Sequence, residues 1–392
     1  MDKDVVIQHP VSRVLWCKPA LLVAIAALFV CVFSIAPNRA LADELKGFQP
    51  GPGTVSKKDM GGSNARHKGR EGYLERWMLR VNRSDGGWMQ LSFILTNLGP
   101  GDHRAVVDIM RLGHGFGKPD TKRVFSRRSK KHLKPNWTVS SKDLNIQMGP
   151  SFLRKKGRGL EGSMKSWDHQ VRFTVSDHGV AWKPGNGMVS FPDGGEYRTQ
   201  ILKTHAQFKG EERRLDGPWH AFQGTVTVEH AVTNLMPHLL ANRMLRAQGK
   251  AGPYTIHFQE IYTPEIWNEE RFGWLVVTQG SKVVASSLRA SAKPTRFRQV
   301  KTKTGSRHRV PVQYVVSAPT DAGSIKLTVK TRSSVHVEDL LSALPKSAQL
   351  VLRALIQPAN MYDRARLQLT LPGEKRTRKG KGLSVYSAVY ER

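Results

Sequence analysis

Cysteine is almost missing from this chain of 392 residues. Its two cysteines, Cys17 and Cys31, both lie near the N-terminus. The chain beyond Cys31 therefore has no disulfide framework, no thiolate metal site and no cysteine nucleophile. Its stability has to come from packed cores alone.

Acidic residues are also scarce, because 31 Asp and Glu stand against 62 Lys and Arg, which gives a net charge of +31. A charge of this size does not specify a fold, but it favours polyanionic partners. We expect the protein to bind an anionic membrane surface or lipopolysaccharide, with acidic polysaccharide as an alternative.

The common motifs of phosphate, dinucleotide, metal and hydrolase chemistry are absent as well. The sequence contains no Walker-type phosphate loop, no G-x-G-x-x-G fingerprint, no H-E-x-x-H helix and no G-x-S-x-G elbow. The 14 histidines show no metal-ligand spacing. We therefore expect neither a metal ion nor a cofactor.

One long apolar run is present, at residues 20–36, after a stretch that carries Lys3, Arg13 and Lys18. Pro37 ends the run, and residues 40–42 (Ala-Leu-Ala) form a small-residue cleavage pattern. Residues 1–42 are predicted to be a signal peptide, with an uncleaved N-terminal anchor as the alternative. Either way the chain is expected in the periplasm or cell envelope, which argues against nucleic acid.

Composition divides the rest of the chain into three parts. Residues 43–72 are rich in Gly, Pro, Lys and Ser and have little to bury, so they are predicted to be a flexible basic linker. A turn signal at residues 215–218 (Leu-Asp-Gly-Pro) then separates two strand-rich halves. We predict domains at residues 73–215 and 216–392.

Two-residue alternation of apolar and polar side chains, typical of strands with one buried face, runs through both halves. Residues 73–81 and 88–96 predict a hairpin around a turn at 82–87. Evenly spaced strands follow, which favours a meander or barrel. Helical periodicity is limited to residues 234–248 and 337–356, so the predicted fold class is mainly β with a few short helices.

Three titratable residues fall on strand faces that are otherwise apolar: Glu75, His230 and Glu260. Burying such a group costs free energy unless it is paired, so these positions are candidate acid or base residues. If they share a pocket, carboxyl groups with a raised pKa could protonate a double bond or activate water. The alternative is that they are satisfied polar groups of the core.

Four aromatic residues lie near these three in sequence, and they are the candidate walls of a pocket for a hydrophobic ligand. They are Trp77, Tyr254, Tyr262 and Trp274.

Two basic clusters in the first half are candidates for an anionic surface. Their residues are Arg123, Arg127, Arg128, Lys130 and Lys131 in one cluster, and Arg154, Lys155 and Lys156 in the other. A solvated loop is the alternative for each cluster.

The stretches GYLERWMLRVNRSDGGWMQLSF, WHAFQGTVTVEHAV, FGWLVVTQGSKVVASS and GKGLSVYSAVYE resemble the AttH, carotenoid-hydratase and survival-factor group. That resemblance, over residues 72–392, implies two lipocalin-like antiparallel β-barrels in tandem that bind or transform lipids and isoprenoids. The chain has Leu74-Glu75-Arg76-Trp77 where the group often has E-W-W-Y. In the second domain the group often has an aspartate-histidine-glutamate-tryptophan run, where this chain has Val228-Glu229-His230-Ala231. These departures weaken the carry-over of hydratase chemistry from the group.

Three functions remain open at this point. The first is an exported, non-enzymatic protein that binds a lipid or another hydrophobic molecule and docks on an anionic membrane or lipopolysaccharide. The second is a hydratase- or isomerase-type enzyme acting on an isoprenoid or lipid. The third is a basic polysaccharide-binding protein of the envelope.

Overall fold

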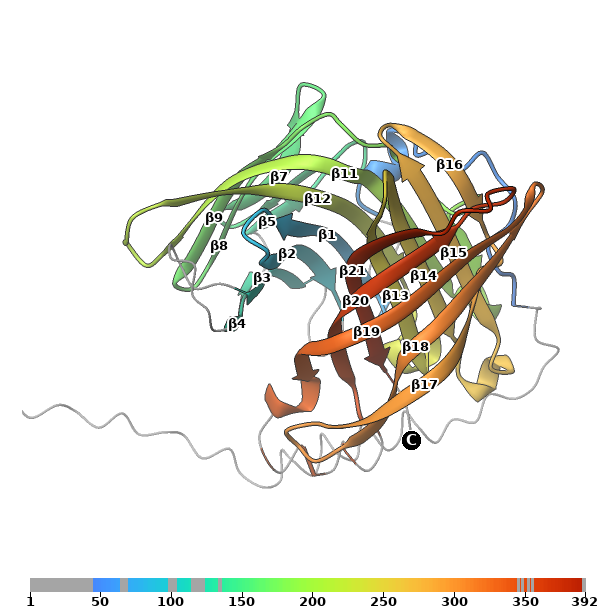
Figure 1. Ribbon diagram of the computed structural model, residues 1–392. Coiled ribbons are helices and arrows are strands. Elements are labelled where there is room, and N and C mark those ends of the chain that lie inside the picture. The colour runs from blue at the N-terminus through green and yellow to red at the C-terminus, as the bar shows by residue number, and fades with distance from the viewer. Residues whose placement is uncertain are drawn as a thin grey trace, which may run out of the picture. The chain divides into compact units, whose positions relative to one another are not determined.

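Antiparallel strands make up most of the chain that the computed structural model describes (Figure 1). The described residues are 45–63, 70–97, 104–113, 124–132, 136–343 and 356–389, together with 346, 349, 350 and 353. The predicted leader lies outside these residues. Within them, no helix is both long and apolar enough to cross a membrane.

The first sheet runs in the order β4-β3-β2-β1-β12-β11-β9-β8-β7-β6-β5, with β10 paired to β11. Alternate side chains of most of its strands are buried in one large apolar cluster, whereas β1 and β2 are buried along nearly their whole length. The strands are β1 (Leu74–Arg83), β2 (Trp88–Thr96), β3 (Arg104–Gly113), β4 (Val124–His132), β5 (Trp137–Val139), β6 (Asn145–Met148), β7 (Ser151–Lys156), β8 (Gly159–Ser166), β9 (His169–Val175), β10 (Met188–Ser190), β11 (Glu196–Arg214) and β12 (His220–Thr233).

The second sheet runs in the order β16-β15-β14-β13-β21-β20-β19-β18-β17. Contacts of β16 with β18 and of β15 with β17 bring its two ends together around a second apolar cluster. The strands are β13 (Arg243–Ala251), β14 (Tyr254–Tyr262), β15 (Arg271–Gln279), β16 (Lys282–Ser287), β17 (Ser291–Lys301), β18 (Arg307–Thr320), β19 (Gly323–Asp339), β20 (Ala359–Thr370) and β21 (Arg378–Ala388).

Both sheets share one topology, in which the first strand pairs with the last. Thus β1 pairs with β12 in the first sheet, and β13 pairs with β21 in the second. Short helices sit in the connections: η1 (Lys58–Met60), η3 (Pro192–Gly194), α2 (Pro237–Leu240), η4 (Glu265–Trp267) and η5 (Leu340–Ala343). The prediction of a mainly β chain with two antiparallel, barrel-like sheets and few helices is confirmed.

The two sheets divide between Thr233 and Arg243, because β12 hydrogen-bonds to β1 and β11 within the first sheet. The turn at residues 215–218, where the sequence placed a domain boundary, joins β11 to β12 instead. Turn residues mark hairpins and domain junctions equally well, so turn chemistry alone could not separate the two cases.

The predicted helix at residues 234–248 is limited to α2, and β13 begins at Arg243. The apolar stripe of that segment fits a helix, but β13 finds hydrogen-bond partners on both sides, in β14 and β21. Pairing across the sheet thus overrides the local periodicity. The first part of the second predicted helix, at 337–356, is strand β19 and η5. The described residues 346, 349, 350 and 353 are helical, as predicted, and much of the rest lies outside the described residues.

Residues 45–63, predicted to belong to a flexible linker, instead pack on the sheets. Lys46 and Ser190 exchange two backbone hydrogen bonds of 2.9 Å. Phe48 is buried in an apolar cluster that includes Trp274 of the second sheet. Asp59 forms a 2.9 Å ion pair with Lys183. A few apolar residues and backbone pairing hold this segment in place despite its polar composition.

Candidate functional site

Two of the predicted acid-base residues, Glu75 and His230, meet inside the first sheet. In the β1–β12 register, Trp77 lies opposite His230. Glu75 lies two residues before Trp77 and shares its face, so its Oε1 comes within 2.8 Å of His230 Nε2. Both side chains are buried. The closure of the sheet thus produces the pair that alternation suggested.

The Glu75 carboxylate is fully hydrogen-bonded. The Tyr73 hydroxyl donates to Oε2, and the backbone N–H of Ser63 donates to Oε1 at 2.9 Å and to Oε2 at 3.1 Å. Burial, followed by the charge of Glu75, raises the pKa of Tyr73 far above its ordinary value, so the phenol keeps its proton. A carboxylate with these donors needs no further partner.

The imidazole of His230 is enclosed in the same way. Its Nδ1 lies 2.8 Å from Gln200 Nε2 and 3.1 Å from the carbonyl oxygen of Asp59. The ring stacks on Trp77 with centroids 4.7 Å apart and planes 7° apart. Residues 59–63 therefore complete the cluster from outside the sheet. The pair could act on a substrate only if this segment moved away.

Glu260, the third candidate, lies apart from this pair, inside the second sheet. The backbone N–H of Ala292 donates to its Oε2 at 3.1 Å, whereas its Oε1 has no hydrogen-bond partner within the described chain. Burial raises the pKa of Glu260 to about 7, and Tyr262, the Ala292 amide, Arg271 and Arg243 only partly oppose this effect. The carboxyl group is thus partly protonated near neutral pH.

The four candidate aromatic residues do not share one pocket. Trp77 belongs to the core of the first sheet. Tyr254 lies at one end of β14, where its hydroxyl donates to Glu374 at 3.0 Å, and Tyr262 lies at the other end. Trp274 is buried in a separate apolar cluster, where its ring centroid is 5.3 Å from that of Trp182.

The described members of the basic clusters are partly neutralised. Arg128 pairs with Asp168 at 3.0 Å. Arg154 and Lys156 both lie 2.8 Å from Glu161. Lys130, Lys131 and Lys155 are exposed or half-buried, while Arg123 and the side chain of Arg127 lie outside what the structure describes.

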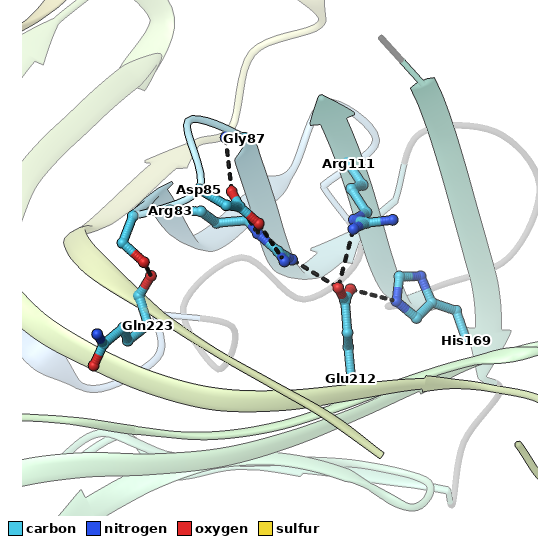
Figure 2. A network of polar contacts seen from close by, with 8 residues as sticks. Arg83, Asp85, Gly87, Arg111, His169, Glu212 and Gln223 are labelled. Carbon is cyan, nitrogen blue, oxygen red and sulfur yellow. Dashed lines mark hydrogen bonds and ion pairs between the residues drawn. The ribbon is translucent and has the colours of Figure 1, made fainter. Parts of the chain in front are cut away.

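A buried charge network, which the sequence did not predict, crosses the interior of the first sheet (Figure 2). Glu212 on β11 lies 2.7 Å from Arg83 on β1, 3.1 Å from Arg111 on β3 and 3.4 Å from His169 on β9. Although burial opposes it, the pKa of Glu212 is lowered by His169 and the two arginines. The network ties strands from opposite walls of the sheet.

A cleft of about 520 Å³ lies between the two sheets. Trp88 and Leu112 of the first sheet and Val335 and Leu383 of the second give it apolar walls. Its basic lining residues are Lys250, Arg332, Arg364, Arg366 and Lys381. No Asp or Glu is among the described residues that line it.

Two histidines also line the cleft. His257 is buried, and neither of its ring nitrogens has a hydrogen-bond partner within the described residues. His205 lies where β11 bulges, and its φ of 113° is rare for a residue with a side chain. Burial lowers the pKa of each to about 4, so both rings are neutral at pH 7.

Cations on four neighbouring strands of the second sheet stand in one row, and three of them, Lys250, Lys381 and Arg366, line this cleft. Lys250 pairs with Lys381, Lys381 with Arg366, and Arg366 with Lys330. The sequence signal for this row is the alternation of Gly with Lys at residues 249–250 and 379–382. A Cβ at Gly380 would lie 1.6 Å from the carbonyl oxygen of Lys250, so the close approach of β13 and β21 requires glycine.

Two solved structures that share this fold align with it over nearly the whole of their own chains. A protein provisionally described as AttH from Nitrosomonas europaea aligns with a TM-score of 0.55 and 12% identity, over 88% of this chain and 99% of that one. Kievitone hydratase from Nectria haematococca aligns with a TM-score of 0.51 and 12% identity, over 88% and 98%. No protein-family model matches the sequence, and the search of curated proteins found no match. The likeness confirms the fold that the sequence resemblance implied.

Replacing Glu75 with Leu is expected to destabilise the protein by about 3 kcal/mol, because Tyr73, Ser63 and His230 would lose their shared acceptor. Urea unfolding measures this change. The exposed Glu265 provides the control, and Glu265→Gln should change the free energy of unfolding by less than about 0.5 kcal/mol. Equal effects of both variants would contradict the assigned role of the Glu75 cluster.

The raised pKa of Glu260 predicts that the protein becomes less stable as the pH rises. Because its pKa in the folded protein is about 7, above the ordinary value of 4.5, the folded state binds the proton more tightly than the unfolded state. The tighter proton binding adds about 3 kcal/mol to the free energy of unfolding below pH 4.5, and this contribution disappears as the pH rises to about 7. The difference in unfolding free energy between the wild type and Glu260→Gln, measured at pH 4 to 8 by denaturant titration, should therefore shift in favour of the variant as the pH rises. A difference independent of pH would show that Glu260 is not held in this state.

Proposed function

We propose that the protein binds an amphipathic anion, a lipid-like molecule with a carboxylate or phosphate group, in the cleft between the two sheets. The observation that carries this proposal is the row of four cations on the second sheet. The ligand would place its charged group against this row and its apolar part between the walls of the cleft.

The row is unfavourable in the absence of an anion. Like charges directly opposite each other on neighbouring strands destabilise a sheet. Lys250, Lys381, Arg366 and Lys330 make three such pairs in succession, and none of the four forms an ion pair within the described chain. A bound carboxylate or phosphate would relieve this repulsion, whereas a neutral ligand would not.

The rest of the cleft suits the other parts of such a ligand. Trp88, Leu112 and Leu383 are buried apolar residues, and they offer contacts to an alkyl or isoprenoid chain. The volume of about 520 Å³ falls within the range of small-molecule sites. A neutral His257 can donate one hydrogen bond and accept another, and binding would give its free nitrogens partners.

This function agrees with the hydrophobic-ligand binding expected from the sequence, but it assigns the ligand to the cleft rather than to the inside of a barrel. With the predicted export signal, the protein would meet its ligand in the periplasm or cell envelope.

The double variant Lys381→Gln/Arg366→Gln should bind dodecyl phosphate about tenfold more weakly than the wild type, because two charges facing the anion are removed. Isothermal titration calorimetry at two salt concentrations measures this change. Lys282→Gln, on an exposed strand of the same sheet, is the matched control and should leave affinity unchanged. Equal affinity for dodecanol and dodecyl phosphate would refute the role of the row.

Acid-base catalysis is a second candidate function, and the unpartnered Oε1 and raised pKa of Glu260 favour it. Glu260 is buried inside the second sheet, so a substrate could reach it only if the sheet opened there. A carboxyl group with a pKa near 7 and one free oxygen can donate a proton to the carbon of an alkene, whose π electrons form the new C–H bond. Water would add to the resulting cation and return its proton to the carboxylate. Glu75 cannot do this while its oxygens are occupied by Tyr73 and Ser63.

Mass spectrometry of isoprenoid alkenes incubated with the protein in deuterated water tests this function. If Glu260 is the acid, deuterated hydration products should form with the wild type and fall by at least about 100-fold with Glu260→Gln. The variant Glu75→Gln serves as the comparison and should keep its activity. Products that persist with Glu260→Gln would exclude Glu260 as the proton donor.

A further inference from the structure

Two hairpin turns of the first sheet end together and expose large apolar side chains. Trp167 lies in the turn between β8 and β9 and is 66% exposed, and Leu215 follows β11 in the turn to β12 and is 64% exposed. Figure 1 shows the β11–β12 hairpin extending beside the ends of β8 and β9. These two turns are called the tip below.

Direct bonds hold the two turns of the tip to each other. The backbone N–H of Leu215 donates to the carbonyl oxygen of Asp168 at 2.5 Å. The Asp168 carboxylate accepts from Arg214 Nε at 2.8 Å and from Arg128 Nε at 3.0 Å. The two turns are therefore tied to each other and, through Arg128, to β4.

The buried charge network of Figure 2 anchors the tip from below. His169 follows Asp168 directly, and Glu212 lies three residues before Leu215. The contact of His169 with Glu212 at 3.4 Å, together with the contacts of Glu212 with Arg83 and Arg111, fixes the bases of both hairpins to the sheet. The exposed side chains thus project from rigid supports.

The backbone at both positions is unusual for the residues that occupy it. Trp167 and Leu215 each have φ of 53°, in the left-handed region that glycine, asparagine or aspartate normally fill. Strain of this kind persists only where the surrounding structure enforces it, and it is often found at functional sites. Two bulky apolar side chains at such positions, both open to solvent, indicate a surface that they are meant to contact.

Basic residues outnumber acidic ones around these side chains. Lys165, Arg172 and Arg214 are exposed and Arg213 is half-buried, while Arg172 pairs with Glu211 and Arg214 with Asp168. The guanidinium groups of Arg172 and Arg213 lie 4.4 Å and 4.6 Å from the ring centre of Trp219, beside the β11–β12 turn. Exposed apolar side chains with basic residues around them suit the interface of a bilayer. Tryptophan is favoured there, and anionic head groups attract arginine and lysine.

We propose that the tip docks on an anionic lipid bilayer, with Trp167 and Leu215 entering the head-group region. An aliphatic leucine offers no surface for base stacking, which favours a lipid partner over nucleic acid. This surface uses no residue of the cleft, so it stands whether or not the cleft binds an amphipathic anion.

The test is the double variant Trp167→Gly/Leu215→Gly in flotation with phosphatidylcholine vesicles that contain phosphatidylglycerol. Because glycine suits a positive φ, the thermal unfolding midpoint should stay the same or rise. Affinity for the vesicles should fall by about tenfold or more, since two interfacial side chains are lost. Weaker vesicle binding without a loss of thermal stability would show that the two side chains act in docking rather than in holding the fold.

Ile266→Ser is the matched control, because Ile266 is a 43% exposed apolar residue of η4, in the connection between β14 and β15 and outside the tip. It should bind these vesicles as the wild type does. Wild-type binding should fall in phosphatidylcholine alone and in high salt. Vesicle binding that survives the double glycine variant, or that Ile266→Ser reduces equally, would overturn the proposal, and a fall in thermal midpoint with unchanged binding would do the same.

Discussion

The pairing of the first strand with the last in each sheet is the constraint on which the rest of the structure depends. The β1–β12 ladder brings Glu75 to His230 across most of the first sheet's sequence, and the β13–β21 ladder sets Lys250 opposite Lys381. Closing such long loops costs chain entropy, which the ladder hydrogen bonds and the apolar clusters on the inner faces offset. Each candidate site is therefore a consequence of closure.

The two sheets differ in how completely their buried carboxyl groups are paired. Inside the first sheet, Glu75 and Glu212 are surrounded by donors, because an ionised group away from water needs partners. Inside the second sheet, Glu260 lacks a full set of hydrogen-bond donors, and burial therefore raises its pKa. On the outer face of the second sheet, the four cations of the row lie opposite one another without acidic partners among the described residues. These differences separate residues that hold the fold together from residues available for function.

Much of the architecture could be predicted from periodicity. Alternation located β1, β2 and β14, and it identified Glu75 and His230 as polar residues on buried faces. It missed β13, because Met244 and Leu245 also fit a helical stripe and only the neighbours β14 and β21 decide the outcome. It also missed the cationic row, since the alternation of Gly with Lys marks single residues but does not give the register that places Lys250, Lys381 and Arg366 side by side.

The sequence by itself determined the excess of basic charge, the lack of cysteine beyond residue 31 and the mainly β character, because composition and two-residue alternation are local properties. Only the tertiary structure decided which of these residues meet. It enclosed Glu75 and His230 with residues 59–63, kept Glu260 apart from them, and gathered Trp167 with Leu215 at one tip. Register between distant strands fixes such contacts, and register depends on the packing of whole sheets rather than on any short stretch of chain.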